Sequence, residues 1–219
     1  MRDRDRAQPF LLLHGGAGPA SVAGFGDLLA ARKRTRVITP THPGFDGTPR
    51  PGTLAGIADL ARLYAALLDR LDVRDVTVIG NSIGGWIAAE LALLGSPRVS
   101  GAILVNAVGI EVEEHPVTDI SGLSPQQIMA LSFHDPGRFA PDPGAPGPTP
   151  EMVQANMTAL AAYGGQSMTD PTLAGRLGEL DLPVLVIWGE SDQIVTPDYG
   201  RAYARAMPMA TFTLMPGAG

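Results

Sequence analysis

Short apolar runs alternate with longer stretches of helical periodicity along most of this chain, a pattern typical of βαβ architecture. Strands buried on both faces are nearly continuous in apolar residues. Most of the strand candidates are such runs, and the candidates are Phe10–Leu13, Arg36–Thr39, Val76–Ile79, Ala102–Val105, Val184–Trp188 and Thr211–Leu214. The pattern therefore predicts an α/β protein with a mostly parallel sheet flanked by helices.

Two helices are predicted between these strands. Residues 57–71 place apolar side chains at spacings of three and four, which is the pattern of an amphipathic helix. Residues 83–94 are apolar on nearly every face, so this second helix is expected to pack beneath the sheet.

The alternation stops between about residues 111 and 175, where no strand pattern is found. Ser124 and Thr149 are each followed by proline, and each is a typical N-cap of a helix. Asp135–Pro150 is rich in Pro, Gly and Asp, which predicts a long loop. We interpret residues 111–175 as a helical lid inserted into a core formed by residues 1–110 and 176–219. The alternative is a poorly ordered surface insertion.

Composition excludes several classes of function. The chain of 219 residues has no cysteine, which excludes disulfides, thiol nucleophiles and thiolate metal sites. Its four histidines are scattered, so we expect neither a metal nor another cofactor. A net charge of −6 gives no reason to expect nucleic acid as a partner. No apolar stretch is long enough for a membrane span or a signal peptide, so a cytoplasmic enzyme without membrane contact is expected.

The strongest chemical signal is Gly80-Asn81-Ser82-Ile83-Gly84-Gly85, which lies between a predicted strand and a predicted helix. A G-x-S-x-G turn in that context forms a strained elbow that exposes the serine hydroxyl. The following helix directs its free N–H groups toward the site. Ser82 is therefore the candidate nucleophile, and the alternative is a glycine-rich turn with an incidental serine.

A second signal is His14-Gly15-Gly16, directly after the first predicted strand. Acyl transfer needs two N–H donors where negative charge develops on the carbonyl oxygen. We assign one donor to Ile83, which follows the nucleophile, and the other to Gly16. His14 is interpreted as a structural residue of this loop and not as a proton carrier.

These motifs resemble the α/β-hydrolase superfamily, in the branch of serine hydrolases that carries a helical lid. The resemblance includes His42-Pro43-Gly44-Phe45-Asp46-Gly47-Thr48 and residues 188–195, and it covers nearly the whole chain. It implies that Asp192 is the acid that orients the catalytic base. Glu190 is the alternative acid, although the register of the family favours Asp192.

The two ends depart from the family pattern. Members begin with two further strands and continue into a catalytic histidine and a final helix, so we expect these strands and this helix to be missing. Arg36–Thr39 would then be an exposed edge of the sheet. The expected histidine would directly follow Gly219. His42 or His134 could replace this histidine only by approaching Ser82, and neither has the orienting partner that Asp192 supplies at the usual position.

The leading hypothesis is a serine hydrolase that cleaves a carboxylic ester or a related acyl compound through an acyl-enzyme intermediate. Activity of this chain is expected to be weak or absent, because a serine hydroxyl is a poor nucleophile without an adjacent base. Alternatives are a C–C bond hydrolase of dienoic ring-cleavage products and a non-catalytic ligand-binding protein. The expected partner is a small molecule, an apolar acyl compound. The sequence leaves the oligomeric state open.

Overall fold

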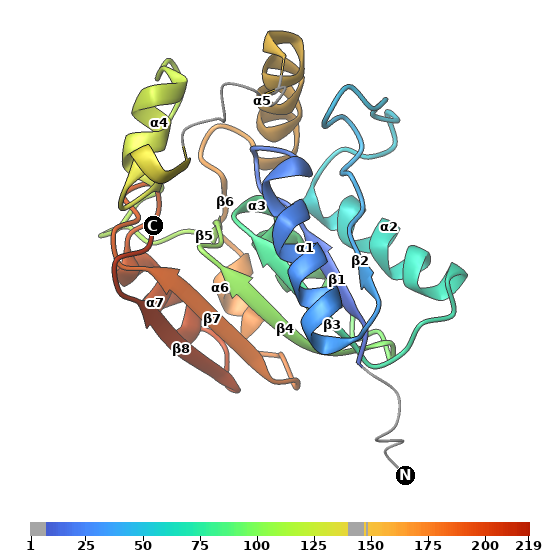
Figure 1. Ribbon diagram of the computed structural model, residues 1–219. Coiled ribbons are helices and arrows are strands. Elements are labelled where there is room, and N and C mark those ends of the chain that lie inside the picture. Colours follow the sequence, from blue (N-terminus) through green and yellow to red (C-terminus); the bar gives the residue numbers. More distant parts are fainter. Residues whose placement is uncertain (1–7, 140–146, 148) are drawn as a thin grey trace.

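Parallel strands form the centre of the molecule, in a computed structural model that describes residues 8–139, 147 and 149–219 (Figure 1). The sheet has six strands in the order β2-β1-β3-β4-β7-β8, and every neighbouring pair is parallel. Their bounds are β1 (Phe10–Leu13), β2 (Val37–Ile38), β3 (Val76–Asn81), β4 (Val99–Val105), β7 (Val184–Gly189) and β8 (Ala210–Met215). The predicted fold class and all six predicted strands are confirmed.

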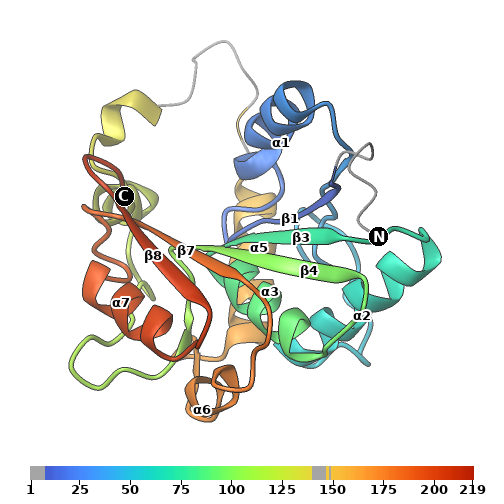
Figure 2. The same ribbon diagram turned by 90° about the horizontal axis from the view of Figure 1, so that it is seen from below.

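Helices cover the two faces of the sheet unequally (Figure 2). α1 (Ala20–Lys33) lies on one face, and α2 (Ile57–Arg70), α3 (Ile83–Leu93), α6 (Leu173–Leu177) and α7 (Pro197–Arg205) lie on the other. α2 and α3 are the two helices that the sequence predicts. β2 is bonded to β1 alone among the described strands, which is the edge position expected for Arg36–Thr39.

The main hydrophobic core lies on the side of α2, α3, α6 and α7. α3 is buried along nearly its whole length, as its uniform apolar character predicts. The largest fully buried side chains on this side include Trp188, Tyr64, Tyr199 and Tyr203. A smaller cluster of Leu12, Val22 and Ile79 packs under α1. The rigid side of the fold is therefore the one that carries the helix of the predicted elbow.

Within residues 111–175, α4 (Pro125–Ser132) and α5 (Pro150–Gly164) lie beyond the carboxyl ends of the strands (Figure 1). Both predicted helix starts are present, because Ser124 Oγ accepts the Gln127 amide at 3.3 Å and Thr149 Oγ1 accepts the Met152 amide at 3.3 Å. Part of the predicted loop Asp135–Pro150 lies outside the described residues, and its start forms a 3-10 turn (Pro136–Phe139).

The prediction that this segment lacks strands is wrong at one place. β6 (Thr169–Asp170) pairs in parallel with β5 (Gly109–Ile110), where the chain leaves and re-enters the sheet domain. A strand of two residues is too short to show an alternation of polar and apolar positions, so the sequence carries no signal for it.

A partly buried ion pair joins the chain to the core where it returns to the sheet. The Arg176 guanidinium of α6 donates to both carboxylate oxygens of Glu90 on α3, at 2.7 and 2.8 Å, and to Asp170 of β6 at 2.8 Å. Glu90 is buried, and a bidentate arginine satisfies such a carboxylate well. The end of the 111–175 segment is thereby held against the helix that follows Ser82.

Candidate active site

Ser82 occupies a strained turn between β3 and α3. Its backbone has φ 54° and ψ −120°, a conformation that residues other than glycine rarely adopt. Its amide donates to the Val105 carbonyl at 2.9 Å, and its carbonyl accepts the Gly85 amide at 2.9 Å. The turn is therefore fixed on both sides, and the half-buried Ser82 side chain stands at the carboxyl edge of the sheet.

The glycines around Ser82 are required by close backbone contacts. A Cβ atom on Gly80 would lie 2.1 Å from the Gly84 carbonyl oxygen, and one on Gly84 would lie 2.4 Å from the Leu13 carbonyl oxygen. A Cβ on Gly85 would lie 2.5 Å from the Ala107 side chain. The motif thus permits β3, α3 and the end of β1 to approach one another more closely than side chains would allow.

The loop after β1 packs directly against the elbow. A Cβ atom on Gly15 would lie 3.2 Å from Ser82 Cβ and 2.6 Å from Asn81 Oδ1. In the part of the chain that the structure describes, the amides of Gly16 and Ile83 donate to no protein group. Ile83 is the first residue of α3, where helix N–H groups have no intrahelical partner. Both predicted donors are therefore unpaired amides; Ile83 directly follows Ser82, and Gly16 directly follows Gly15, which packs against Ser82.

His14 fixes the orientation of the Gly16 amide. The His42 amide donates to His14 Nε2 at 3.0 Å, so this nitrogen is unprotonated and His14 Nδ1 donates to the Gly15 carbonyl at 2.8 Å. That carbonyl belongs to the same planar peptide group as the Gly16 N–H, and the two point in opposite directions. Burial lowers the pKa of His14, which keeps the ring neutral. These contacts agree with the structural role expected for His14.

His42 is engaged at both ring nitrogens. Its Nε2 donates to the His14 carbonyl at 3.0 Å, and its Nδ1 accepts the Tyr64 hydroxyl. Burial lowers the pKa of His42 to about 3, and electrostatic repulsion between two protonated rings at His14 and His42 acts in the same direction. These contacts leave His42 no free nitrogen to take a proton from Ser82.

Asp192 lies in the loop after β7 and is 6% exposed. Its Oδ1 accepts the amides of Ile194 and Val195 at 2.8 and 2.9 Å, and its Oδ2 accepts the Asn106 side-chain amide at 2.6 Å. Burial raises the pKa of Asp192 to about 6, against the lowering effect of these hydrogen bonds. Glu190 is exposed and accepts the Gly217 amide at 3.0 Å.

Ser82, Asn106 and Asp192 follow three strands that are adjacent in the sheet, β3, β4 and β7. The carboxyl ends of parallel strands share one edge, which is where α/β proteins bind ligands. Asn106 also accepts the Gly189 amide at 2.9 Å, so it joins the end of β4 to the Asp192 loop. Sequence reasoning missed Asn106, whose only signal is a polar residue directly after a buried strand.

His134 contacts the loop of Asp192 rather than Ser82. Its Nδ1 lies 2.7 Å from Ser191 Oγ, and the neighbouring Leu131 carbonyl accepts the Gln193 amide at 2.9 Å. Within residues 8–139, 147 and 149–219, no histidine is hydrogen-bonded to Ser82 or to the Asp192 carboxylate. The described site therefore contains a candidate nucleophile, two unpaired amides and a buried carboxylate, without an imidazole between them.

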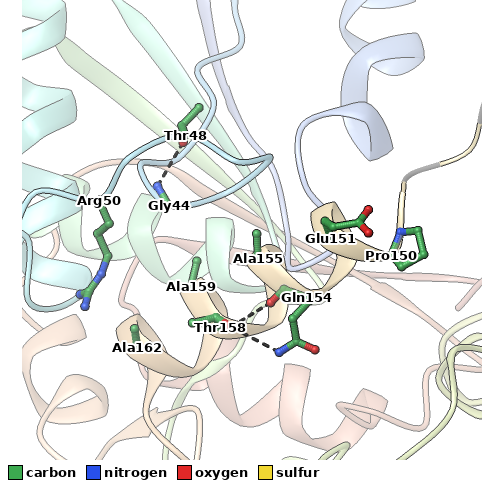
Figure 3. Close-up of a pocket in the computed structure, with 10 residues that line it drawn as sticks. All are labelled: Gly44, Thr48, Arg50, Pro150, Glu151, Gln154, Ala155, Thr158, Ala159 and Ala162. Atoms are coloured by element: carbon green, nitrogen blue, oxygen red, sulfur yellow. Dashed lines mark hydrogen bonds between the residues drawn. The ribbon is translucent and has the colours of Figure 1, made fainter.

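A groove of about 770 Å³ lies between α5 and the loop that follows β2 (Figure 3). Small side chains of α5, among them Ala155 and Ala159, face Gly44 and Thr48 across it, and Arg50 stands at one end. Ser82 is not among its lining residues. The residues that line this groove therefore do not include the candidate nucleophile.

Comparison with known proteins identifies related sequences. The model of the alpha/beta hydrolase family matches residues 10–219. The chain is 33% identical over 116 residues to 2-hydroxy-6-oxo-2,4-heptadienoate hydrolase of Pseudomonas putida, a match that covers 52% of this chain and 42% of that protein. It is 28% identical to 2-hydroxy-6-oxononadienedioate/2-hydroxy-6-oxononatrienedioate hydrolase of Cupriavidus pinatubonensis, over 93% of this chain and 77% of that protein.

Solved structures share the fold. 2-Hydroxy-6-oxo-6-phenylhexa-2,4-dienoate hydrolase from a Rhodococcus strain superposes with a TM-score of 0.73 at 20% identity, covering 97% of this chain and 84% of that one. A thermophilic esterase from Thermogutta terrifontis gives a TM-score of 0.71 at 22% identity, covering 98% and 83%. At this identity the likeness concerns the fold alone.

Proposed function

The chain belongs to the alpha/beta hydrolase family, and from that premise we propose that it is a serine hydrolase with Ser82 as its nucleophile. Ser82 Oγ attacks the carbonyl carbon of an ester or a related acyl compound. The amides of Gly16 and Ile83 hold the oxygen as it gains negative charge. A base takes the Ser82 proton and returns it to the leaving alcohol, and water then releases the acid from the acyl-enzyme.

The strained backbone of Ser82 is the observation that carries this proposal. At φ 54° and ψ −120°, Ser82 lies outside the left-handed region that ordinary turns use, and the three glycines around it cannot accept a Cβ atom. This conformation projects the hydroxyl away from the sheet beside two unpaired amides. That arrangement is what an acyl-transfer site requires.

The base would lie beside Asp192, whose buried carboxylate would orient an imidazole and stabilise its protonated form. Gly219 is next to this position, because a side-chain atom on Gly219 would lie 3.2 Å from the Asp192 amide nitrogen. A histidine carried by the following residue of a longer chain would therefore be adjacent to Asp192.

We place the acyl group under the 111–175 segment, which would act as a lid. Leu160 of α5 lies over Gly16, since a Cβ atom on Gly16 would be 3.0 Å from Leu160 Cδ2. A group bound at the Gly16 amide thus meets an apolar side chain. This contact favours a small-molecule substrate with an apolar acyl part.

Cleavage of a C–C bond in a dienoic ring-cleavage product is the second candidate. The curated relatives at 28 and 33% identity are hydrolases of such dienoates. In this reaction Ser82 would attack a ketone carbonyl in the same way. The leaving group would be a carbon atom, which must receive a proton as the C–C bond breaks. A panel of a dienoic ketone and a simple aryl ester of similar size distinguishes the two candidates by their relative kcat/KM.

The proposed function is tested by the rate of hydrolysis of a short aryl ester by this chain and by its Ser82→Ala variant, each with and without added imidazole. Without imidazole, we expect only a small difference in hydrolysis rate between the parent and Ser82→Ala. With imidazole, the parent should exceed the variant by about tenfold or more, because the described residues place no imidazole on Ser82 and the added one can act as the base. Equal rates under both conditions would refute Ser82 as the nucleophile.

A further inference from the structure

Asn156 is a buried polar residue on α5 that joins three separate parts of the chain. It is 6% exposed, and its Oδ1 accepts the Asp46 amide in the loop after β2 at 2.7 Å. Its Nδ2 donates to the Ala17 carbonyl in the loop after β1 at 3.4 Å. A buried amide side chain is costly unless it is paired, so its position between these loops is specific.

The Ala17 contact continues through the backbone to the Gly16 amide. The Ala17 carbonyl shares a peptide plane with the Gly18 N–H, and this N–H donates to the Gly15 carbonyl at 3.1 Å. The Gly15 carbonyl in turn shares a plane with the Gly16 N–H. Two peptide groups therefore connect Asn156 with the amide that would bind the oxyanion.

The loop depends on such external contacts because its glycines do not restrict their own torsions. Gly15, Gly16 and Gly18 have no Cβ atom, and Gly18 has φ 88°. Peptide planes between glycines can rotate at little steric cost. His14 fixes the Gly15 carbonyl from the core side, and Asn156 fixes the Ala17 carbonyl from the side of α5.

We propose that Asn156 is a positioning residue for the oxyanion-binding amide of Gly16, so that the oxyanion hole is complete only while α5 is docked on the loop. This inference rests on the proposed function. Leu160, one turn further along α5, covers Gly16, and Tyr163 donates to the Pro43 carbonyl at 3.0 Å. α5 therefore meets both loops along one face, and Asn156 is its polar contact with the loop that carries Gly16.

The test compares the parent chain with Asn156→Asp and with the control Gln154→Glu. The aspartate has the same shape and can still accept the Asp46 amide, but it cannot donate to the Ala17 carbonyl. Gln154→Glu adds a negative charge at an exposed position of α5, where the Gln154 side chain donates to Thr158 of the same helix at 3.5 Å. Unfolding midpoints of all three chains report any general loss of stability.

Amide hydrogen exchange measures the positioning without relying on catalysis. We expect the Gly18 amide to exchange about tenfold faster in Asn156→Asp, while the Gly85 amide of the elbow keeps its protection. Imidazole-assisted acylation of Ser82 should fall about tenfold or more in kcat with little change in KM, since a donor to the oxyanion acts in the transition state. Gln154→Glu should match the parent in both measurements.

The outcomes separate the two claims. Unchanged exchange at Gly18 overturns the positioning role even if Ser82 is acylated normally. Faster exchange with unchanged kcat shows that Asn156 orders the loop without serving catalysis, which also overturns the proposal. If the parent itself shows no Ser82-dependent acylation, the proposed function fails and the catalytic role of Asn156 fails with it, whatever the exchange data show.

Discussion

His14 and His42 stack in the core with their ring centroids 3.8 Å apart, and the His42 amide donates to His14 Nε2 at 3.0 Å. The pair sits between the Tyr64 hydroxyl and the Gly15 carbonyl, so a line of hydrogen bonds runs from α2 to the loop beside Ser82. Each ring needs a specific neutral tautomer for this line to form. The loop after β1 is therefore sensitive to protonation of either ring.

This pairing predicts a loss of stability in weak acid. The pKa of His42 is about 3 in the folded chain and near 6.5 when unfolded, so its contribution is lost as pH falls below 6.5. Between pH 7 and pH 5 we expect His42 to remove about 2 kcal/mol from the free energy of unfolding. Urea titrations at the two pH values measure this loss.

The variant His42→Gln supplies the comparison. The free energy of unfolding of this variant should fall between pH 7 and pH 5 by about 2 kcal/mol less than that of the parent. His134→Gln, at an exposed histidine, should leave the decrease unchanged. An equal decrease in the parent and in His42→Gln would show that the core imidazole is not held neutral.

The raised pKa of Asp192 predicts that stability depends on pH in the direction opposite to that for His42. Its folded pKa of about 6 lies above the usual 3.8, so the protonated form contributes stability that is present below pH 3.8 and is lost as pH rises through 6. Relative to Asp192→Asn, the parent should lose about 2 kcal/mol between pH 4 and pH 7. Urea titrations of both chains from pH 4 to pH 7 test this, and a constant difference between them contradicts the assignment.

The elbow glycines predict unequal effects of the same substitution. Gly84→Ala should destabilise the chain by about 2 kcal/mol or more, because its Cβ would lie 2.4 Å from the Leu13 carbonyl oxygen. Gly24→Ala, in α1 with no atom within 4 Å of the added Cβ, should stabilise it by about 0.5 to 1 kcal/mol. Thermal unfolding midpoints decide this, and a stable Gly84→Ala would mean that the turn is looser than described.

The elements that the sequence predicts well are those with a long local signal. Each strand of the large sheet is a run of apolar residues, and the elbow is marked by glycines at fixed spacing around Ser82. α1 was not predicted, because Phe25 and Leu28 are apolar yet half exposed and blur its amphipathic pattern. α7 was also missed, although Thr196 before Pro197 is a typical helix start and its hydroxyl accepts the Tyr199 amide at 3.5 Å.

The contacts that order the candidate site could not be predicted in the same way. Asn106, Asn156 and Tyr64 are single residues whose partners lie far along the chain, so no local pattern marks them. Sequence spacing also leaves open whether His42 faces Ser82 or the core. Only the fold shows that both of its ring nitrogens are already hydrogen-bonded.

The central claim is that Ser82 is a nucleophile, and acyl transfer to its hydroxyl tests this most directly. The chain and its Ser82→Ala variant are incubated with an activated aryl ester and imidazole, and the products are analysed by intact-protein and peptide mass spectrometry. We predict that the parent gains one acyl group on the peptide that contains Ser82 and that the variant does not. Equal labelling of the two chains, or a label on any other residue alone, would contradict the account.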